Sequence, residues 1–336
     1  MSKRERVARW SELLGFTAFV RHLPRRGCLA VLNYHRIGDS ASTPYDPGTF
    51  SATESEFDEH VSLLKRLFTI VTLEEAVDYC RCERSAAKSL ALITFDDGYV
   101  DNYRSAFSVL RAHGVQGTFF LPTSFIGTSS IPWWDAIAWQ VKTSRRGSLR
   151  LAYPADITIP LKPDPHAALR RLLAIYKQPA TNSARFISQL EEATGVACPV
   201  AAPDRLFMNW TEAAEMARAG MGIGSHTHSH EVLSKMSADR QYDEFRTSRE
   251  TLRQRIGIAP DTLAFPVGSK TSFSDCTAAC LERAGYRAAF SFYGGVNRCG
   301  STNPFDIRRM PGDNDEGRAT LRLRLALTSA TGRLLI

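Results

Sequence analysis

Eight short strand-like runs, several of them almost purely apolar, recur along the 336-residue chain, separated for the most part by segments with helical spacing. The strand-like runs are 28–35, 68–71, 89–95, 117–122, 221–225, 262–267, 286–292 and 305–309, and the helical segments are 54–66, 73–81, 100–113, 211–219, 237–256 and 275–284. Strands that are apolar on both faces are typical of parallel sheets covered by helices on each side. The sequence therefore predicts an α/β fold, a distorted (β/α) barrel of about seven or eight parallel strands.

One stretch interrupts this alternation. Residues 128–205 contain Trp133, Trp134 and Trp139, many prolines, and only weak helical patterns. We predict an insertion over one end of the barrel rather than a separate domain. The barrel domain then covers 28–312, between two terminal segments that are described by their composition: a basic amphipathic segment, 1–27, and a basic, leucine-rich helix, 313–336.

The formal charge of +7 suits an anionic membrane surface, an acidic glycan or nucleic acid and does not by itself choose among them. A nucleic-acid partner is nevertheless not expected. The terminal segments could lie on anionic lipid or pack on the domain. No apolar stretch is long enough to span a bilayer, and the start of the chain lacks a secretory signal pattern.

Seven irregularly spaced cysteines are explained most simply as free thiols in a reducing compartment. We therefore expect a cytoplasmic protein, with contact at the inner membrane face as an option.

Two adjacent carboxylates end one of the apolar runs. Asp96 and Asp97 follow the strand candidate 89–95 directly and precede Gly98. Active sites of parallel α/β folds form where the strands end. Neighbouring side chains on an extended chain diverge, so one carboxylate can bind a cation while the other addresses a water molecule. A plain Asp-Asp-Gly turn is the alternative.

Three histidines follow another strand candidate. His226 and His230 are four residues apart, and His228 lies between them. Two residues four apart share a face of a helical turn, whereas all three would share a face of an extended chain. Either arrangement can bind a metal ion. Two further strand ends, at His35 and Pro266, are weaker candidates for the same site.

Together these motifs resemble those of the polysaccharide deacetylases, carbohydrate esterase family 4, whose catalytic region is called the NodB homology domain. Residues 94–98 read TFDDG, which is the family's first motif, and residues 226–230 read HTHSH, which satisfies its second. The resemblance covers roughly 29–125 and 205–310. It implies a barrel of the NodB-homology type.

The resemblance also implies roles for single residues. Asp97, His226 and His230 would be the ligands of a divalent metal, usually zinc, with cobalt or nickel as alternatives. Asp96 would be the general base. A backbone N–H, that of Tyr99, would help to hold the oxyanion.

The chain departs from the family pattern at two places. No histidine follows His230, so the late Leu-x-His motif that supplies the acid is missing, and no arginine precedes Pro266 in the third motif. A subgroup of the family begins with a Tyr-His-Arg-Ile strand, which residues 34–37 match. The resemblance to this subgroup implies that His35 is the acid.

The sequence leaves two site assignments open: the arginine that orients Asp96, and the role of two tryptophans. Arg308 or Arg309 would orient Asp96. Trp133 and Trp134 would line a groove for sugar rings, although core packing explains these tryptophans equally well.

These expectations define a metal-dependent hydrolase that removes N-acetyl groups from amino sugars of a polysaccharide or a lipid-linked glycan. The subgroup implies exopolysaccharide, capsule or lipid-linked glycan metabolism. Three alternatives stay open: a deformylase of a lipid-linked amino sugar, a non-heme iron oxygenase, whose metal is also held by two histidines and a carboxylate, and a catalytically inactive glycan-binding homologue.

Overall fold

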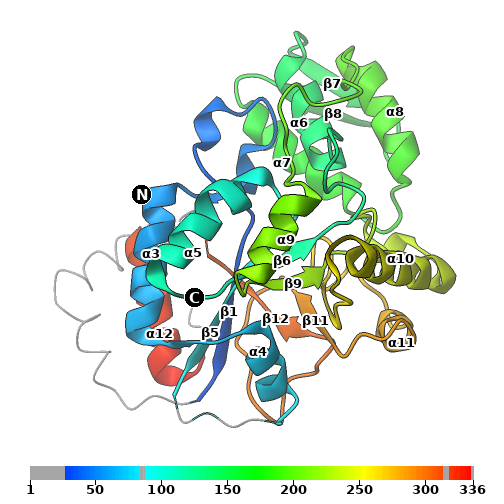
Figure 1. Ribbon diagram of the computed structural model, residues 1–336. Helices are drawn as coiled ribbons and strands as arrows, with labels where there is room; N and C mark the ends of the chain where they lie inside the picture. Colours follow the sequence, from blue (N-terminus) through cyan, green and yellow to red (C-terminus); the bar gives the residue numbers. More distant parts are fainter. Residues whose placement is uncertain (1–26, 84–85, 87, 313–317, 334–336) are drawn as a thin grey trace.

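The computed structural model describes residues 27–83, 86, 88–312 and 318–333. Within these residues the main sheet contains the strands β1 (Leu29–Tyr34), β4 (Thr69–Ile70), β5 (Leu90–Phe95), β6 (Thr118–Leu121), β9 (Gly222–Ser225), β10 (Thr262–Ala264), β11 (Ala288–Ser291), β12 (Ile307–Arg308) and β13 (Met310–Pro311). Eight of these strands form a nearly closed barrel in the order β12-β11-β10-β9-β6-β5-β1-β13, and every pairing between neighbours is parallel (Figure 1). β4 adds to β5 outside this path. The predicted (β/α) barrel of seven or eight strands is confirmed.

One extended segment closes the barrel. β12 pairs with β11, and β13, which follows directly after Arg309, pairs with β1 on the other side. Asn297 holds this segment in place. Its side-chain amide donates to the carbonyl of Arg308 (2.9 Å) and accepts from the N–H of Arg308 (2.8 Å), and its backbone exchanges two hydrogen bonds of 2.9 Å with Leu29.

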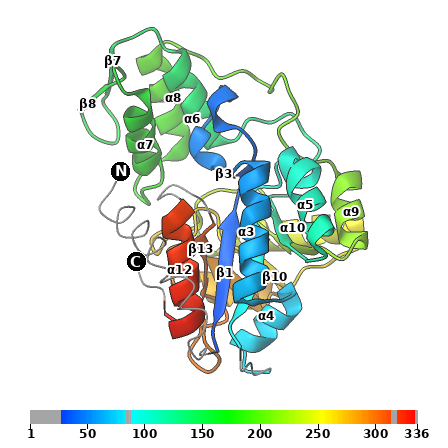
Figure 2. The same ribbon diagram turned by 90° about the vertical axis from the view of Figure 1, so that its left-hand side faces the viewer.

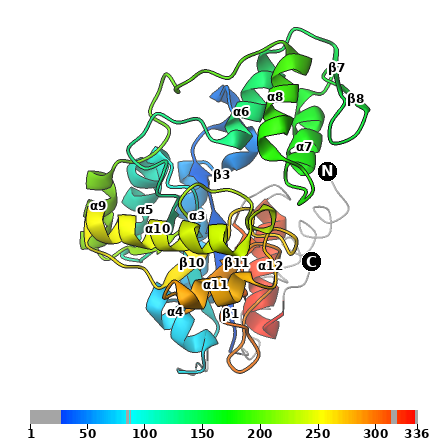
Figure 3. The ribbon, with the colours of Figure 1, turned by 90° about the vertical axis from the view of Figure 1, so that its right-hand side faces the viewer.

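Helices surround the barrel (Figures 1 and 3). They are α3 (Glu54–Leu67), α4 (Leu73–Cys80), α5 (Phe107–His113), α9 (Trp210–Arg218), α10 (Ala238–Ile256), α11 (Thr277–Arg283) and α12 (Arg318–Thr331). Capping boxes start α3, α4 and α9, where Thr53, Thr72 and Asn209 accept from the backbone N–H three residues later. These side chains satisfy N–H groups that a helix start leaves unpaired, which fixes where each helix begins.

The helix α12 lies beside α3 and β1 (Figure 2). Its Leu321 and Leu325 are buried in the same hydrophobic cluster as Leu64 of α3. Arg318 pairs with Glu59 of α3 at 2.6 Å. The predicted amphipathic segment 1–27 lies outside the described residues except for its last position. Among the residues that the structure describes, no helix is both long enough and apolar enough to cross a lipid bilayer.

The insertion stands over the end of the barrel where the strands finish (Figure 1). It contains α6 (Trp133–Thr143), α7 (Pro165–Tyr176), α8 (Ser183–Thr194) and the antiparallel hairpin of β7 (Ser148–Leu151) with β8 (Ile157–Pro160). Its apolar side chains form a hydrophobic cluster distinct from those of the barrel, with Leu172 and Phe186 fully buried. Tyr99 and Phe207, from loops of the barrel, belong to the same cluster. The insertion therefore packs directly against the segments that follow the strands.

Asn297→Ala tests the closing segment. Asn297 is almost completely buried, and its loss leaves the N–H and C=O of Arg308 without their partner. We expect the free energy of unfolding to fall by about 2–3 kcal/mol, measured by urea titration. Asn303→Ala, at an exposed asparagine of the same loop, is the control and should change it by about 1 kcal/mol or less. Equal losses in the two variants would show that Asn297 does not anchor the barrel closure.

Candidate active site

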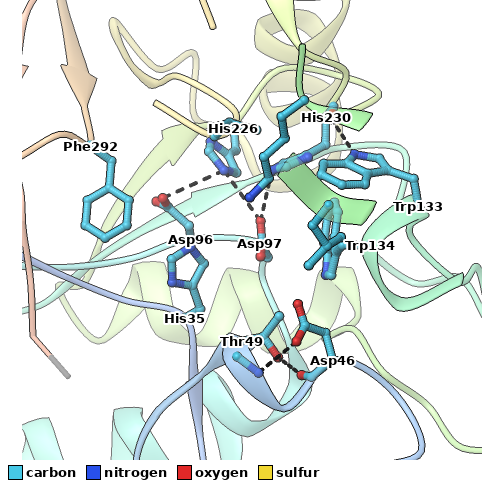
Figure 4. Close-up of a pocket in the computed structure, with 14 residues that line it drawn as sticks. His35, Asp46, Thr49, Asp96, Asp97, Trp133, Trp134, His226, His230 and Phe292 are labelled. Carbon is cyan, nitrogen blue, oxygen red and sulfur yellow. Dashed lines mark hydrogen bonds and ion pairs between the residues drawn. The ribbon is translucent and has the colours of Figure 1, made fainter. Parts of the chain in front are cut away.

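A cavity of about 220 Å³ lies between the ends of the barrel strands and the insertion (Figure 4). Barrel segments and the insertion both contribute to its wall. The lining residues are His35, Asp46, Gly48, Thr49, Asp96, Asp97, Trp133, Trp134, Leu173, Lys177, His226, His230, Val267 and Phe292.

The three predicted metal ligands converge in this cavity. One ligand atom from each of Asp97, His226 and His230 lies within 4.8 Å of the other two. Oδ1 of Asp97 is 3.5 Å from Nε2 of His226 and 3.2 Å from Nε2 of His230. The Nδ1 atom of His226 pairs with the carbonyl of Ala264 (2.8 Å), which leaves Nε2 facing the other ligands. His228 is not one of the three residues whose ligand atoms converge, and its Nδ1 atom pairs with the Thr123 hydroxyl (2.9 Å).

These residues fit a divalent cation. Oδ1 of Asp97 is buried and has no hydrogen-bond partner among the described residues. A buried carboxylate oxygen without a hydrogen bond is costly, and a cation placed between it and the two imidazoles would satisfy it. One carboxylate and two imidazoles are the donor set of many catalytic zinc sites, which leave coordination positions open.

The backbone around the ligands is strained. Asp97, Thr227, His230 and Val267 have φ values of 70°, 65°, 56° and 64°, and they are four of the five non-glycine residues in this conformation in the described part of the chain. The left-handed region is especially unfavourable for β-branched Thr227 and Val267. Such strain persists only where surrounding contacts hold it, and it concentrates at functional sites. Here the hydroxyl of Thr227 accepts from the N–H of His230 (3.1 Å).

Asp96 lies beside the ligands and is held by two side chains. Its Oδ1 accepts from Arg309 at 2.7 Å, and its Oδ2 accepts from the amide of Asn33 at 3.0 Å. Oδ2 lies 3.8 Å from Nε2 of His226. Burial raises the pKa of Asp96, but the charges of Arg309 and His226 and the hydrogen bond from Arg309 outweigh it and lower the pKa below its usual value. Asp96 is therefore a carboxylate at neutral pH.

Of the two candidate arginines, only Arg309 reaches Asp96, and the assignment of Arg308 to the site is corrected. Neighbouring side chains of an extended segment point in opposite directions. Arg309 is fully buried and also donates to the carbonyl of Ser291 at 3.0 Å. Arg308 is exposed, and its guanidinium lies 5.6 Å from the ring centroid of Tyr293.

His35 follows β1 directly and projects into the cavity near Asp96 and Asp97 (Figure 4). Its backbone is fixed on both sides. The N–H donates to the hydroxyl of Ser51 (3.0 Å), and the carbonyl accepts from the amide of Asn102 (2.6 Å). The ring itself is half-buried, so it can meet a molecule bound in the cavity.

The two tryptophans line the cavity and also contact His230, one of the predicted metal ligands. The ring of Trp134 lies 4.5 Å from that of His230, and the indole N–H of Trp133 donates to the carbonyl of His230 (3.4 Å). Trp134 also donates to the hydroxyl of Tyr99 (2.7 Å), which in turn donates to Asp135 (3.0 Å). The insertion thus holds His230 and the loop after β5. The Tyr99 side chain is buried in this network and does not line the cavity.

The loop after β10 meets the cavity through Val267, not through the buried Pro266. Pro266 accepts from the N–H of Gly268 (2.7 Å), which turns the chain and presents Val267. Gly268 is required at this turn. It has a φ of 65°, and a Cβ atom there would lie 2.7 Å from Phe292.

Several site residues were not predicted from the sequence. Asn33 is a polar residue inside an apolar run, a signal that could have identified it. Asp46 and Lys177 line the cavity, but an isolated aspartate in a loop and a lysine after a helix carry no such signal. Burial raises the pKa of Asp46 and lowers that of Lys177. Glu244 of α10 accepts from the N–H groups of His228 and Ser229 (2.9 and 2.7 Å) and so shapes the histidine loop.

The sequence of this chain is similar to those of known polysaccharide deacetylases. The sequence model of the family "Polysaccharide deacetylase" matches residues 83–289. Over 102 residues the chain is 33% identical to the Bacillus subtilis (strain 168) protein "Putative polysaccharide deacetylase YxkH", an alignment that covers 30% of this chain and 33% of that protein. The chain thus spans only about a third of this curated relative.

Solved structures share the fold. IcaB from Ammonifex degensii is 19% identical, with a TM-score of 0.59 over 91% of this chain and 98% of that one. The Streptococcus pyogenes deacetylase PplD, solved with acetate, is 15% identical, with a TM-score of 0.56 over 88% of this chain and 96% of that one. A de-N-acetylase from Aggregatibacter actinomycetemcomitans is 18% identical, with a TM-score of 0.55 over 88% and 99%.

The family match covers more than half of the chain and includes Asp96, Asp97, His226 and His230. The chain belongs to the polysaccharide deacetylase family.

Proposed function

We propose that this protein is a metal-dependent N-deacetylase that removes acetyl groups from the amino sugars of a polysaccharide or lipid-linked glycan. One observation supports this most directly. Asp97, His226 and His230 face one another within 4.8 Å, and next to them Asp96 is held as a carboxylate by Arg309. Neither an iron oxygenase nor a binding protein needs this second, oriented carboxylate.

Asp97, His226 and His230 are the residues that would hold the cation. A divalent cation bound there would lower the pKa of a coordinated water molecule and polarise the acyl carbonyl. Zinc suits the donor set best, and cobalt and nickel accept the same ligands.

Asp96 is assigned as the general base. Its Oδ2 faces His226, on the metal-ligand side, whereas its Oδ1 is occupied by Arg309. The lowered pKa keeps the carboxylate ready to accept the proton of the attacking water molecule. Arg309 holds Oδ1 and the amide of Asn33 donates to Oδ2, so the group does not have to reorient during the reaction.

His35 is assigned as the acid that protonates the departing amino nitrogen. Its ring projects into the cavity from the strand next to the one that carries Asp96 (Figure 4). The backbone N–H of Tyr99 is assigned to the oxyanion, as in the resemblance. The half-buried Trp133, with Lys177 and Asp46, would contact the sugar, because an aromatic face and a few polar groups suit a sugar ring.

Acetate release from an N-acetylglucosamine oligomer tests the proposal. Metal-stripped protein should be inactive, and zinc, cobalt or nickel should restore release. His226→Ala should bind substoichiometric zinc and lose activity by about 10²-fold or more, because only two ligands remain. His228→Ala removes a histidine two residues away that points to Thr123, and it should bind zinc and release acetate normally.

If the protein released formate from a formylated amino sugar but no acetate, the proposed substrate would become a formyl amide, and the proposed metal site would stand. Equal zinc binding by wild type and His226→Ala, or acetate release by the metal-stripped protein, would contradict the proposal.

Arg309→Met should move the acidic limb of the pH–rate profile to higher pH. The wild-type pKa of Asp96 is lowered, so the base is already ionised in weakly acidic solution. Without Arg309, burial dominates and raises the pKa of Asp96. Asp96 is then protonated in weakly acidic solution and cannot act as the base. We expect kcat/KM at pH 5.5, relative to pH 8, to fall about tenfold or more. Arg308→Met is the matched control, and Arg309→Lys, which keeps the charge, should shift the limb less. An unchanged limb in Arg309→Met would exclude this role.

His35→Ala should lower kcat for the amide substrate by about 10²–10⁴-fold, because the amine leaving group needs a proton. An aryl acetate, whose phenolate leaves without protonation, should be hydrolysed with a much smaller loss. Zinc content should not change. Equal losses on both substrates would show that His35 does not act as the acid.

A further inference from the structure

Two exposed cysteines from distant parts of the chain meet at the far end of the barrel from the cavity. Cys82 lies in the turn after α4, and Cys299 lies in the loop between β11 and β12. They are 217 positions apart, and their sulfur atoms are 2.6 Å from each other. Asn297, close to Cys299, pairs with Leu29, the first residue of β1, so this contact lies where the strands begin.

The folded backbone holds both thiols in this position. Cys82 has a φ of 60°, which makes it the fifth non-glycine residue in the left-handed region of the described chain, and its N–H donates to the carbonyl of Tyr79 (3.2 Å). The Cys299 loop is closed by hydrogen bonds between Arg298 and Thr302. In this folded arrangement the sulfur of Cys82 lies against that of Cys299.

The other nearby cysteines are poor competitors for this pair. Cys28 and Cys80 are buried, and burial raises the pKa of each, in Cys80 to about 12. A thiol must ionise to react, so these two are nearly inert at neutral pH. The hydrogen bond that Cys299 donates to Cys82 raises the pKa of the Cys299 thiol as well. Cys82 and Cys299 differ from the other two in being solvent-exposed and in direct contact, so an oxidant can reach them.

We propose that Cys82 and Cys299 form a disulfide bond whenever the protein meets an oxidising thiol–disulfide environment. Glutathione disulfide supplies the chemistry. The thiolate of one cysteine attacks a glutathione sulfur, which releases one glutathione thiolate and leaves a mixed disulfide. The second cysteine thiolate then attacks the protein sulfur of this mixed disulfide, forms the S–S bond and releases the second glutathione thiolate. The two protein thiol protons end on the two glutathione molecules.

The bond would join the turn after α4 to the loop that leads into the closing segment of the barrel. This loop contains Asn297, which fixes Arg308, and it precedes Arg309, which contacts Asp96. Linking positions 217 residues apart restricts the unfolded chain strongly. The disulfide therefore stabilises the barrel closure while its atoms stay away from the cavity.

Peptide mapping tests the bond directly. Purified full-length protein is incubated with glutathione disulfide, free thiols are alkylated, and the protein is digested with trypsin without reduction. Cleavage after Arg81 and Arg298 separates Cys82 from Cys80, so the expected product is peptide 82–84 linked to peptide 299–308. Dithiothreitol should release the two peptides.

Thermal unfolding provides the second readout. Oxidation should raise the Tm of the wild type by roughly 4–10 °C. The rise should vanish in Cys82→Ser and in Cys299→Ser, and persist in Cys198→Ser, a control in the insertion. Recovery of Cys82 and Cys299 as separately alkylated or glutathionylated residues would overturn the proposal. So would an oxidation-dependent Tm rise of the same size in Cys82→Ser.

Discussion

The buried ion pair between Arg309 and Asp96 connects the closure of the barrel to its chemistry. Arg309 lies between β12 and β13, the two halves of the segment that pairs with both β11 and β1. Only when this segment is in register does the guanidinium reach the carboxylate at 2.7 Å. Burying both charges is costly, and removing one partner from such a pair typically costs about 3–5 kcal/mol. The pair makes sense as a positioning device, because it keeps Asp96 ionised and oriented in an environment where burial alone would protonate it.

The loops that carry the proposed metal ligands are held by α10 and by the insertion. Asp97, Thr227 and His230 adopt left-handed conformations that would relax if the chain were free. Three sets of contacts prevent this relaxation. Glu244 of α10 accepts from the histidine loop, Trp134 packs on His230, and the same indole binds the hydroxyl of Tyr99 in the loop after β5. The insertion is thus part of the site as well as a cover over it.

Much of this arrangement could be predicted from the sequence, and the remainder depends on contacts that the sequence does not display. Apolar runs on both faces of a strand determine a parallel barrel, and polar residues at the strand ends identify Asp96, Asp97, His226 and His230. The choice between Arg308 and Arg309 depends on which face of one short segment points inward, and a single-residue change of register reverses it. The positions of Lys177 at the cavity and of Cys82 beside Cys299 depend on packing between distant parts of the chain, which no local sequence pattern predicts.

We have proposed that Asp97, His226 and His230 hold one cation beside Asp96. Anomalous X-ray scattering from crystals of the zinc-loaded protein, measured above and below the zinc absorption edge, tests it most directly. We expect one strong peak between the carboxylate of Asp97 and the Nε2 atoms of His226 and His230, with Asp96 near it but still bound to Arg309. A stoichiometrically loaded crystal whose zinc peak lies elsewhere, or whose peak is ligated by Asp96 in place of Asp97, would show that these three residues do not form the metal site.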